Sequence, residues 1–413
     1  MGNRSLRNAK MAKNDDYYTL LSDIEDELQY YWKYGTNHFE GKSVLCNCDN
    51  PEFSNFWVYF HKNFKRLGLK RLTAIHYSIS ESAFVKVYSG GSDEDISSGT
   101  VRYLDGDGDF RSAECIEILE GADIVVTNPP FSLFREFISQ LIEYNKEFII
   151  IGSISVGSGK FLFPFIHNNE VWFGVTTGSK SYILPDDSPI VGKPQSYYQD
   201  GQWYQKLGNT CWITNIDIPR RHEWLNLIKE YSSGIYYKYE NYDAINVDKL
   251  TDIPVDYFEC YIVPVMYRDN LKGYTAYSMS DFLTAVKDKT LKTDKVVIEY
   301  KNELLVPVIN GNIDKLSSLS TLGGVKYRSG IMGVPVTFLC KHNPEQFEII
   351  GCPNSGVLPD GWEGMHEDFL SLYRSQGGTG KFEFYNRSAC YIDSDGKAIV
   401  PYTRILICRS LYL

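Results

Sequence analysis

The stretch that organises this chain is Asp123–Phe131, which reads Asp-Ile-Val-Val-Thr-Asn-Pro-Pro-Phe. Its first part is apolar and rich in β-branched residues, which predicts a buried strand. The two prolines that follow supply no backbone N–H groups and cannot continue a strand ladder. We therefore expect Asn128–Phe131 to form a corner at the carboxyl end of a central strand, where open α/β sheets bind their ligands.

The first half of the chain alternates segments that read as strands with segments that read as helices. Apolar runs predict seven strands, at Ser43–Cys48, Leu72–Tyr77, Thr100–Leu104, Asp123–Thr127, Phe148–Ile151, Glu170–Val175 and Cys211–Ile216. Apolar residues at helical spacing predict helices at Tyr17–Tyr34, Phe53–Phe64, Ser112–Leu119 and Leu133–Tyr144. This alternation predicts βαβ units in a mainly parallel sheet with helices on both faces.

The alternation ends near Pro219, and the residues beyond it are less regular. Lys295–Ile309 reads as a β-hairpin, because two apolar runs flank a polar turn. A chain of 413 residues is long enough for two domains. We therefore predict an α/β domain over residues 1–218 and a second, mixed domain over residues 219–413.

The composition limits the classes of protein to which the chain can belong. Hydrophobic residues make up 43% of it, which is enough for a packed core. No apolar run reaches the length of a membrane span and no signal segment is visible, so no membrane partner is expected. The nine cysteines are odd in number and scattered, which predicts a reducing, cytoplasmic setting without a disulfide framework.

Neither the net charge nor the spacing of possible metal ligands predicts a nucleic-acid partner or a metal site. The net charge of −10 argues against a nucleic-acid partner, since phosphate contacts need lysine and arginine. The net charge can hide a local basic face, and lysines and arginines do cluster at 4–13, 62–71 and 287–295. Each cluster alone is more typical of a solvated face. No metal site is predicted: Cys46 and Cys48 lack a second ligand pair, and Phe110 stands where a calcium loop beginning at Asp105 would need glycine.

The chemistry of the corner suits an amine donor. The side chain of Asn128 offers a carbonyl oxygen, and the prolines offer backbone carbonyls without competing N–H groups. Two adjacent acceptors can take both hydrogens of an exocyclic amine and direct its lone pair out of the ring plane. Phe131 adds a flat face for a planar ring, so the corner describes a pocket for a heterocycle such as adenine. A simple strand terminator made of two prolines is the alternative reading.

The Asn-Pro-Pro-Phe corner resembles the amino-methyltransferase signature Asn/Asp-Pro-Pro-Tyr/Phe, and the chain resembles the EcoRI-type adenine-specific DNA methyltransferases. The resemblance covers most of the chain, and its block from Gly106 to Glu136 is the most specific. The segments that carry it are Asp15–Thr19, Leu28–Tyr31, Cys46–Asp49, Gly106–Ser112, Asp123–Glu136, Trp212–Asn215, Tyr242–Ile245 and Gly333–Phe338.

This resemblance implies a Rossmann-like α/β methyltransferase fold, with a mixed seven-stranded sheet, and a C-terminal α+β target-recognition region. It implies transfer of a methyl group from S-adenosyl-L-methionine to N6 of an adenine flipped out of a specific double-stranded DNA site. Such enzymes are intracellular, prokaryotic or phage-encoded, and can have a cognate restriction endonuclease as a companion. The alternatives are a catalytically inactive DNA-binding module and a methyltransferase acting on RNA or a protein amide.

The resemblance also assigns roles to individual residues. Those implied to be catalytic are Asn128, Pro129, Pro130 and Phe131. Those implied to bind the cofactor are Tyr18, Thr19, Cys46, Asn47, Asp49, Pro51, Asp109, Phe110 and Asn128.

Three departures from the family pattern are visible. The loop after the first strand reads Asp-Asn-Pro-Glu-Phe from Asp49, without the usual glycines. The second strand ends in His76–Ser78, without a carboxylate for the ribose hydroxyls of the cofactor. A segment at about 260–329 is predicted to be an insertion, either a module facing DNA or a partner, or a tolerated surface addition.

Overall fold

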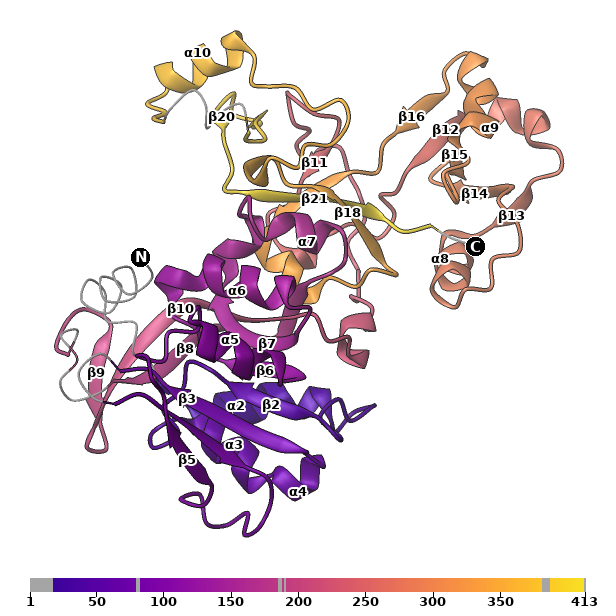
Figure 1. Ribbon diagram of the computed structural model, residues 1–413. Coiled ribbons are helices and arrows are strands. Elements are labelled where there is room, and N and C mark those ends of the chain that lie inside the picture. Colours follow the sequence, from indigo (N-terminus) through magenta and orange to yellow (C-terminus); the bar gives the residue numbers. More distant parts are fainter. Residues whose placement is uncertain (1–17, 79–81, 185–187, 189–190, 381–386, 412–413) are drawn as a thin grey trace. The chain divides into compact units, whose positions relative to one another are not determined.

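The computed structural model describes residues 18–78, 82–184, 188, 191–380 and 387–411 (Figure 1). The chain divides into two compact units. The first comprises Met1–Gly157 and Asn168–Arg221, and the second comprises Ser158–His167 and His222–Leu413. The division at Arg221 lies close to the predicted boundary, whereas Ser158–His167 joins the second unit.

The first unit is built around one ten-stranded sheet. Its strands are β1 (Tyr18–Thr19), β2 (Ser43–Cys46), β3 (Arg71–His76), β4 (Phe84–Tyr88), β5 (Thr100–Tyr103), β6 (Ile124–Thr127), β7 (Glu147–Ser153), β8 (Trp172–Leu184), β9 (Ser196–Gln199) and β10 (Gln202–Thr214). Its helices are α2 (Leu21–Leu28), α3 (Asn55–Lys62), α4 (Phe64–Leu67), α5 (Ala113–Glu120) and α6 (Phe134–Glu143).

The strand order is β1-β8-β10-β7-β6-β2-β3-β4-β5, with β9 paired to β10. The central strands β3, β2, β6 and β7 are parallel, and every other pairing is antiparallel. All seven predicted strands are present. The count of seven is nevertheless wrong, because β1, β4 and β9 join them, and the sheet is parallel only at its centre.

All three missed strands pair in antiparallel fashion, and two of them, β1 and β9, are short. Tyr18–Thr19 has two residues and was predicted as helix, yet it pairs with Tyr182–Ile183 of β8. Ser196–Gln199 carries mostly exposed side chains and pairs with the outer part of β10. Strand propensity depends on the neighbouring strand, so short segments such as these gain their structure from pairing.

Helices cover both faces of the sheet, as predicted. Val44 and Cys46 of β2 face a core cluster that includes Leu28 of α2 and Phe60 of α3. On the opposite face, a Cβ atom at Gly152 of β7 would lie 3.0 Å from the ring of Phe134 in α6. The alternation of side chains along a strand thus buries both faces of the parallel centre.

The second unit holds two larger sheets and a two-stranded one. Its strands are β11 (Ile245–Asn246), β12 (Cys260–Pro264), β13 (Thr275–Tyr277), β14 (Val296–Tyr300), β15 (Glu303–Pro307), β16 (Lys326–Arg328), β17 (Met332–Pro335), β18 (Phe347–Gly351), β19 (Tyr391–Ile392), β20 (Ala398–Ile399) and β21 (Arg404–Arg409). Its helices are α7 (Phe163–His167), α8 (Met279–Lys287), α9 (Ile313–Leu316) and α10 (Glu367–Ser375).

The five-stranded sheet of the second unit, ordered β13-β14-β15-β12-β16, uses only residues between Cys260 and Arg328. The predicted hairpin is confirmed as β14 and β15, with Ile298 opposite Leu305. The four-stranded sheet, ordered β11-β17-β21-β18, draws on residues from both sides of that segment. The segment predicted as an insertion therefore forms a sheet of its own.

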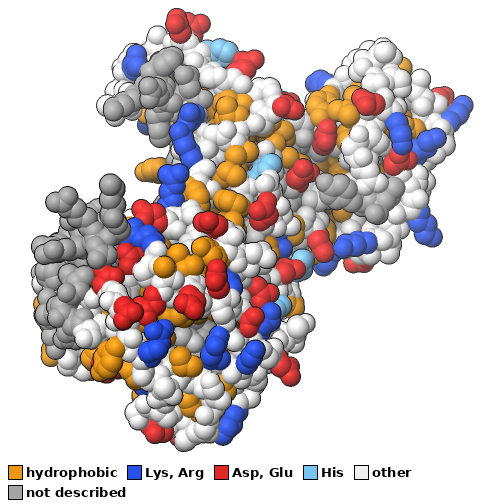
Figure 2. Space-filling view, in the orientation of Figure 1, with side chains coloured by type: hydrophobic (Ala, Val, Ile, Leu, Met, Phe, Trp, Pro, Cys, Tyr) orange, Lys and Arg blue, Asp and Glu red, His pale blue; other side chains and the backbone are white. Residues whose placement is uncertain are grey.

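The surface mixes charges of both signs. The lysines of the 287–295 cluster are exposed, but Asp288 and Asp294 lie among them, and Lys289 pairs with Glu345 at 3.3 Å. Figure 2 shows acidic and basic side chains interspersed on the visible face. Within the described part of the chain, no helix has the length and apolarity needed to cross a membrane.

Candidate active site

The Asn128 corner lies where three parallel strands end side by side. β6 ends at Thr127, and its neighbours β2 and β7 run in the same direction. Asn128–Pro130 turns the chain, and Phe131 begins a short 3₁₀ turn before α6. The predicted position of the corner, at the carboxyl end of a central strand, is confirmed.

The corner side chains are partly accessible. Pro129 is buried, whereas Asn128, Pro130 and Phe131 are half-buried. The ring of Phe131 packs against the core cluster that contains Val126. Packing on one side fixes the ring, and partial exposure leaves area on which a flat group can stack.

The loop after β2 is tied to the corner by a buried carboxylate. One oxygen of Asp49 accepts a hydrogen bond from the Thr127 hydroxyl, and the other accepts from Ser54 Oγ at 2.8 Å. Asp49 is 6% exposed. Burial raises its pKa to about 6, although the two hydroxyl donors act in the opposite direction. Asp49 therefore joins this loop to the residue that directly precedes Asn128.

This loop turns without glycine. Asn50 Oδ1 accepts from the backbone N–H of Glu52 at 3.0 Å, and its carbonyl accepts from Ser54 N at 2.8 Å. Ser54 then caps α3, because its hydroxyl accepts from Phe56 N. No residue from 47 to 54, all of which the structure describes, has a positive φ. An Asx turn and a proline thus shape this loop without glycine.

The N-terminal segment reaches the far end of the same loop. Asn55 Nδ2 donates to the carbonyl of Thr19 at 2.8 Å, and the rings of Tyr18 and Phe53 lie 6.3 Å apart. Pairing of β1 with β8 holds Tyr18 and Thr19 in place. The structure thereby brings these two predicted cofactor residues beside the loop that contains Asp49.

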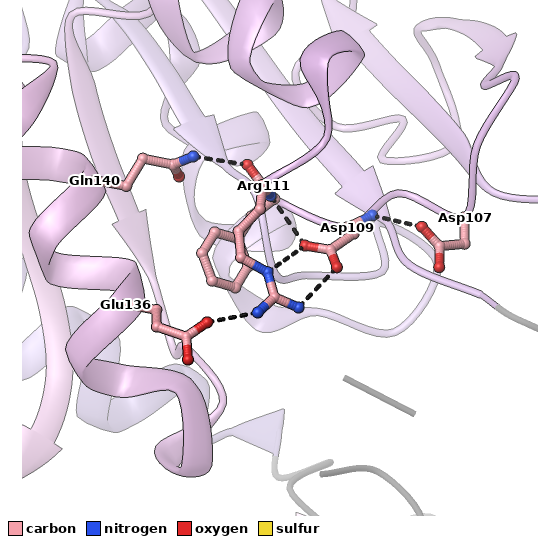
Figure 3. Close-up of polar contacts among 6 residues, drawn as sticks. Asp107, Asp109, Arg111, Glu136 and Gln140 are labelled. Atoms are coloured by element: carbon pink, nitrogen blue, oxygen red, sulfur yellow. Dashed lines mark hydrogen bonds and ion pairs between the residues drawn. The ribbon is translucent and has the colours of Figure 1, made fainter. Parts of the chain in front are cut away.

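A second loop, residues 105–112, is closed by an ion-pair network (Figure 3). Arg111 donates to both oxygens of Asp109, from Nε at 3.0 Å and from Nη2 at 2.8 Å. Its remaining terminal nitrogen pairs with Glu136 of α6. The hydrogen bonds that Arg111 donates to Asp109 raise the pKa of the Arg111 guanidinium. The loop is therefore fixed to the helix that follows the Asn128 corner.

Phe110 belongs to the interior of this network. It is 3% exposed, and its ring lies 5.1 Å from that of Phe137 in an edge-to-face contact. Its carbonyl accepts from Gln140 Nε2 at 2.9 Å. Arg111 covers another side of the ring, with its guanidinium 5.3 Å from the ring centre. The Phe110 side chain thus packs loop 105–112 against α6.

Cys48 stands near both loops. Burial raises the pKa of its thiol well above the ordinary value, and the negative charges of Asp49 and Asp109 add to that rise. The hydrogen bond from Thr127 to Asp49 and the ion pair of Arg111 with Glu136 tie the two loops to the elements on either side of the corner. Among the described residues, no three histidine, cysteine, aspartate or glutamate side chains are grouped to hold a metal ion.

The family profile described as "Adenine-specific methyltransferase EcoRI" matches residues 5–304 and 312–410. The chain belongs to this family. The two matched stretches are separated by residues 305–311, which lie within the segment at about 260–329, and the insertion there stays a prediction.

Three relatives agree with this assignment. The Type II methyltransferase M.EcoRI of Escherichia coli is 36% identical over 364 residues, which cover 84% of this chain and 89% of the relative. M.MpnI of Mycoplasma pneumoniae is 36% identical over 304 residues, 72% of this chain and 92% of its own. M.MgeORF184P of Mycoplasma genitalium is 30% identical over 349 residues, 83% and 84% of the two chains. No solved structure matches the chain.

For this member of the EcoRI methyltransferase family, the structure separates the predicted cofactor residues by environment. Asn47, Asp49 and Pro51 lie in the loop after β2 and are buried. Cys46 is fully buried in the core, and its side chain serves packing, as that of Phe110 does. The cofactor-binding roles that the family resemblance implies for these residues remain predictions.

Sequence reasoning missed the residues that brace the site. Thr127 and Ser54 hold Asp49, and Arg111 joins Asp109 to Glu136. Ser54 carried a readable signal, since a serine just before a helical pattern is a preferred N-cap. The pairing of Thr127 with Asp49, far away in sequence, depends on β2 and β6 being neighbours.

Proposed function

We propose that this chain transfers a methyl group from S-adenosyl-L-methionine to N6 of an adenine flipped out of a specific double-stranded DNA site. The observation that carries the proposal is the Asn-Pro-Pro-Phe corner at the carboxyl end of β6. It lies beside the Asp49 loop in a chain of the adenine-specific EcoRI methyltransferase family.

We further propose that the first unit is a Rossmann-like methyltransferase domain and the second a target-recognition region. The run β3-β2-β6-β7-β10-β8 supports the first assignment, because chain order reverses direction at β2 and β6. Ligands bind at such a switch point in open α/β sheets. Residues 260–328 form a separate sheet, which supports a distinct part for this segment within the proposed target-recognition region.

The residues around the corner fit S-adenosyl-L-methionine. Thr19 Oγ1 is buried and has no hydrogen-bond partner among the described residues, so a ligand there would satisfy it. The carboxylate of Asp49, which neutral hydroxyls hold, suits a ligand that carries positive charge. Tyr18, Thr19 and the loop after β2 would hold the methionine part. When bound, the cofactor supplies a methyl group activated by its sulfonium.

The Asn128 corner would bind the adenine amine and orient it for methyl transfer. Asn128 Oδ1 and the Pro129 carbonyl accept the two hydrogens of the adenine amine, which turns the nitrogen lone pair out of the ring plane. Pro129 and Pro130 have no N–H groups that would compete for these acceptors. No general base is needed before attack, because the amine loses its proton only after the new N–C bond forms.

Phe131 would hold the flipped base by stacking. Extruding a base from a duplex costs a few kcal/mol. Stacking on an aromatic side chain returns about 1–3 kcal/mol. Phe131 therefore offsets much of the cost, and contacts to the DNA backbone supply the remainder.

The test is incorporation of tritiated methyl groups into DNA, RNA and peptide substrates. We expect label in duplex DNA as N6-methyladenine, and Asn128→Ala should reduce it to background while S-adenosylhomocysteine still binds. Asn168→Ala is the matched control, since Asn168 is exposed and away from the corner. Incorporation by Asn128→Ala within a few-fold of wild type would contradict the role of Asn128. Label in RNA or peptide instead of DNA would contradict the proposed substrate.

A further inference from the structure

The end of β3 lacks the acidic side chain that Rossmann-like sheets use to bind ribose hydroxyls. Loop 105–112 reaches this position from elsewhere in the chain. The carbonyl of Asp107 accepts a hydrogen bond from Ser78 N at 2.9 Å, two residues beyond the last residue of β3, His76. The backbone of Asp107 is thereby pinned at the carboxyl end of the second parallel strand.

Gly108 allows this close approach. Its φ is +79°, and a Cβ atom there would lie 2.9 Å from the carbonyl oxygen of His76 and 3.1 Å from Cα of Tyr77. Any other residue would meet backbone atoms and adopt a strained conformation. Glycine at this position therefore lets the loop lie directly against the end of β3, and it fixes where the carboxylate of Asp107 stands.

The half-buried carboxylate of Asp107 and the buried carboxylate of Asp109 differ in their partners. Both oxygens of Asp109 accept hydrogen bonds from Arg111. Asp107 Oδ1 accepts from Asp109 N at 3.1 Å, but Asp107 Oδ2 is buried and has no partner among the described residues. Figure 3 shows Asp107 on the side of Asp109 away from Arg111. An unsatisfied buried carboxylate oxygen is costly, and a vicinal diol would supply the missing donors.

We propose that Asp107 binds the ribose hydroxyls of the cofactor, in place of a carboxylate at the end of β3. The inference rests on the proposed function, because it assigns a contact within the same cofactor site. Asp109, held by Arg111, fixes the loop, while Asp107 makes the diol contact.

The test is calorimetric binding of S-adenosylhomocysteine and of its 2′,3′-dideoxyribose analogue, without any turnover. We expect Asp107→Asn to weaken binding of S-adenosylhomocysteine about 10- to 100-fold, as for loss of hydrogen bonds to a charged group. The dideoxy analogue should bind wild type and variant within twofold of each other. Asp105→Asn is the matched control, because Asp105 is exposed in the same loop.

A second variant tests whether a loss of binding comes from a disturbed loop and not from the missing carboxylate. Asp107→Ser keeps an oxygen that can accept from Asp109 N and removes the carboxylate. Unchanged affinity in the variants, or equal weakening for both ligands, would overturn the assignment and leave the proposed function standing. Failure of the wild-type protein to bind S-adenosylhomocysteine would instead contradict the proposed function itself.

Discussion

The loops after β2 and before α5 both bury an acidic residue beside the Asn128 corner, but they hold it by different chemistry. Asp49 is held by two neutral hydroxyls, those of Ser54 and Thr127. Asp109 is held by the guanidinium of Arg111. Both acids are almost fully buried: Asp49 is 6% exposed and Asp109 is 4% exposed.

The two acids differ in how their burial is compensated. Neutral donors compensate only part of the desolvation of Asp49, so its pKa rises to about 6. An opposite charge compensates Asp109, and Arg111 extends the contact to Glu136 on α6. Thr127 precedes Asn128, and α6 follows the corner. The corner is therefore braced on one side by a pH-sensitive contact and on the other by an ion pair.

Removing the ion pair should have the largest effect. Arg111→Leu leaves the charge of Asp109 buried without a counter-charge, so we expect a loss of about 3 kcal/mol in the free energy of unfolding. Urea unfolding at pH 8 measures it. Arg102→Leu is the control, because Arg102 is exposed in its pair with Glu114 and should lose less than about 1 kcal/mol. Equal losses in the two variants would show that the two pairs do not differ.

The second prediction concerns the pH dependence that Asp49 contributes. Its pKa in the folded protein, about 6, lies above the ordinary value of 3.8, so the folded state binds the proton more tightly. Its contribution to stability therefore falls as the pH rises from about 4 to about 6, by on the order of 2–3 kcal/mol. Asp49→Asn should remove this part of the slope.

The measurement is urea unfolding of wild type and Asp49→Asn at pH 4, 5, 6 and 8. The difference between the two proteins isolates Asp49 from other titrating groups. Asp105→Asn, at an exposed carboxylate, provides the control curve. Parallel curves for wild type and Asp49→Asn over this range would mean that Asp49 has an ordinary pKa.

The smallest effect is expected from loss of one hydroxyl. Thr127→Val keeps the shape of β6 and removes one donor to Asp49, so we expect a loss of about 1–2 kcal/mol at pH 8. The loss should shrink below pH 6, where Asp49 is protonated. Thr100→Val, at an exposed strand position, should stay within about 0.5 kcal/mol. A loss that does not change with pH would separate Thr127 from the charge of Asp49.

Sequence patterns located the Asn128–Phe131 corner and seven strands of the sheet, because apolar runs and proline pairs act locally. They missed β1, β4 and β9, whose structure depends on pairing. They also read Tyr18–Thr19 as the start of a helix, although β8 draws these residues into a strand. The roles of the predicted cofactor residues stay predictions, and the pattern could not show that Cys46 and Phe110 are buried in the core.

The sequence by itself determined the α/β class, the corner at Asn128–Phe131 and the family of the chain. These depend on short motifs and on the period of apolar residues, which a single segment carries. Only the tertiary structure decided which acids have partners. Asp49 meets Thr127, and Asp107 meets Ser78, because the order of strands brings distant loops to one edge of the sheet. Burial then raises the pKa of Asp49, and no local pattern encodes it.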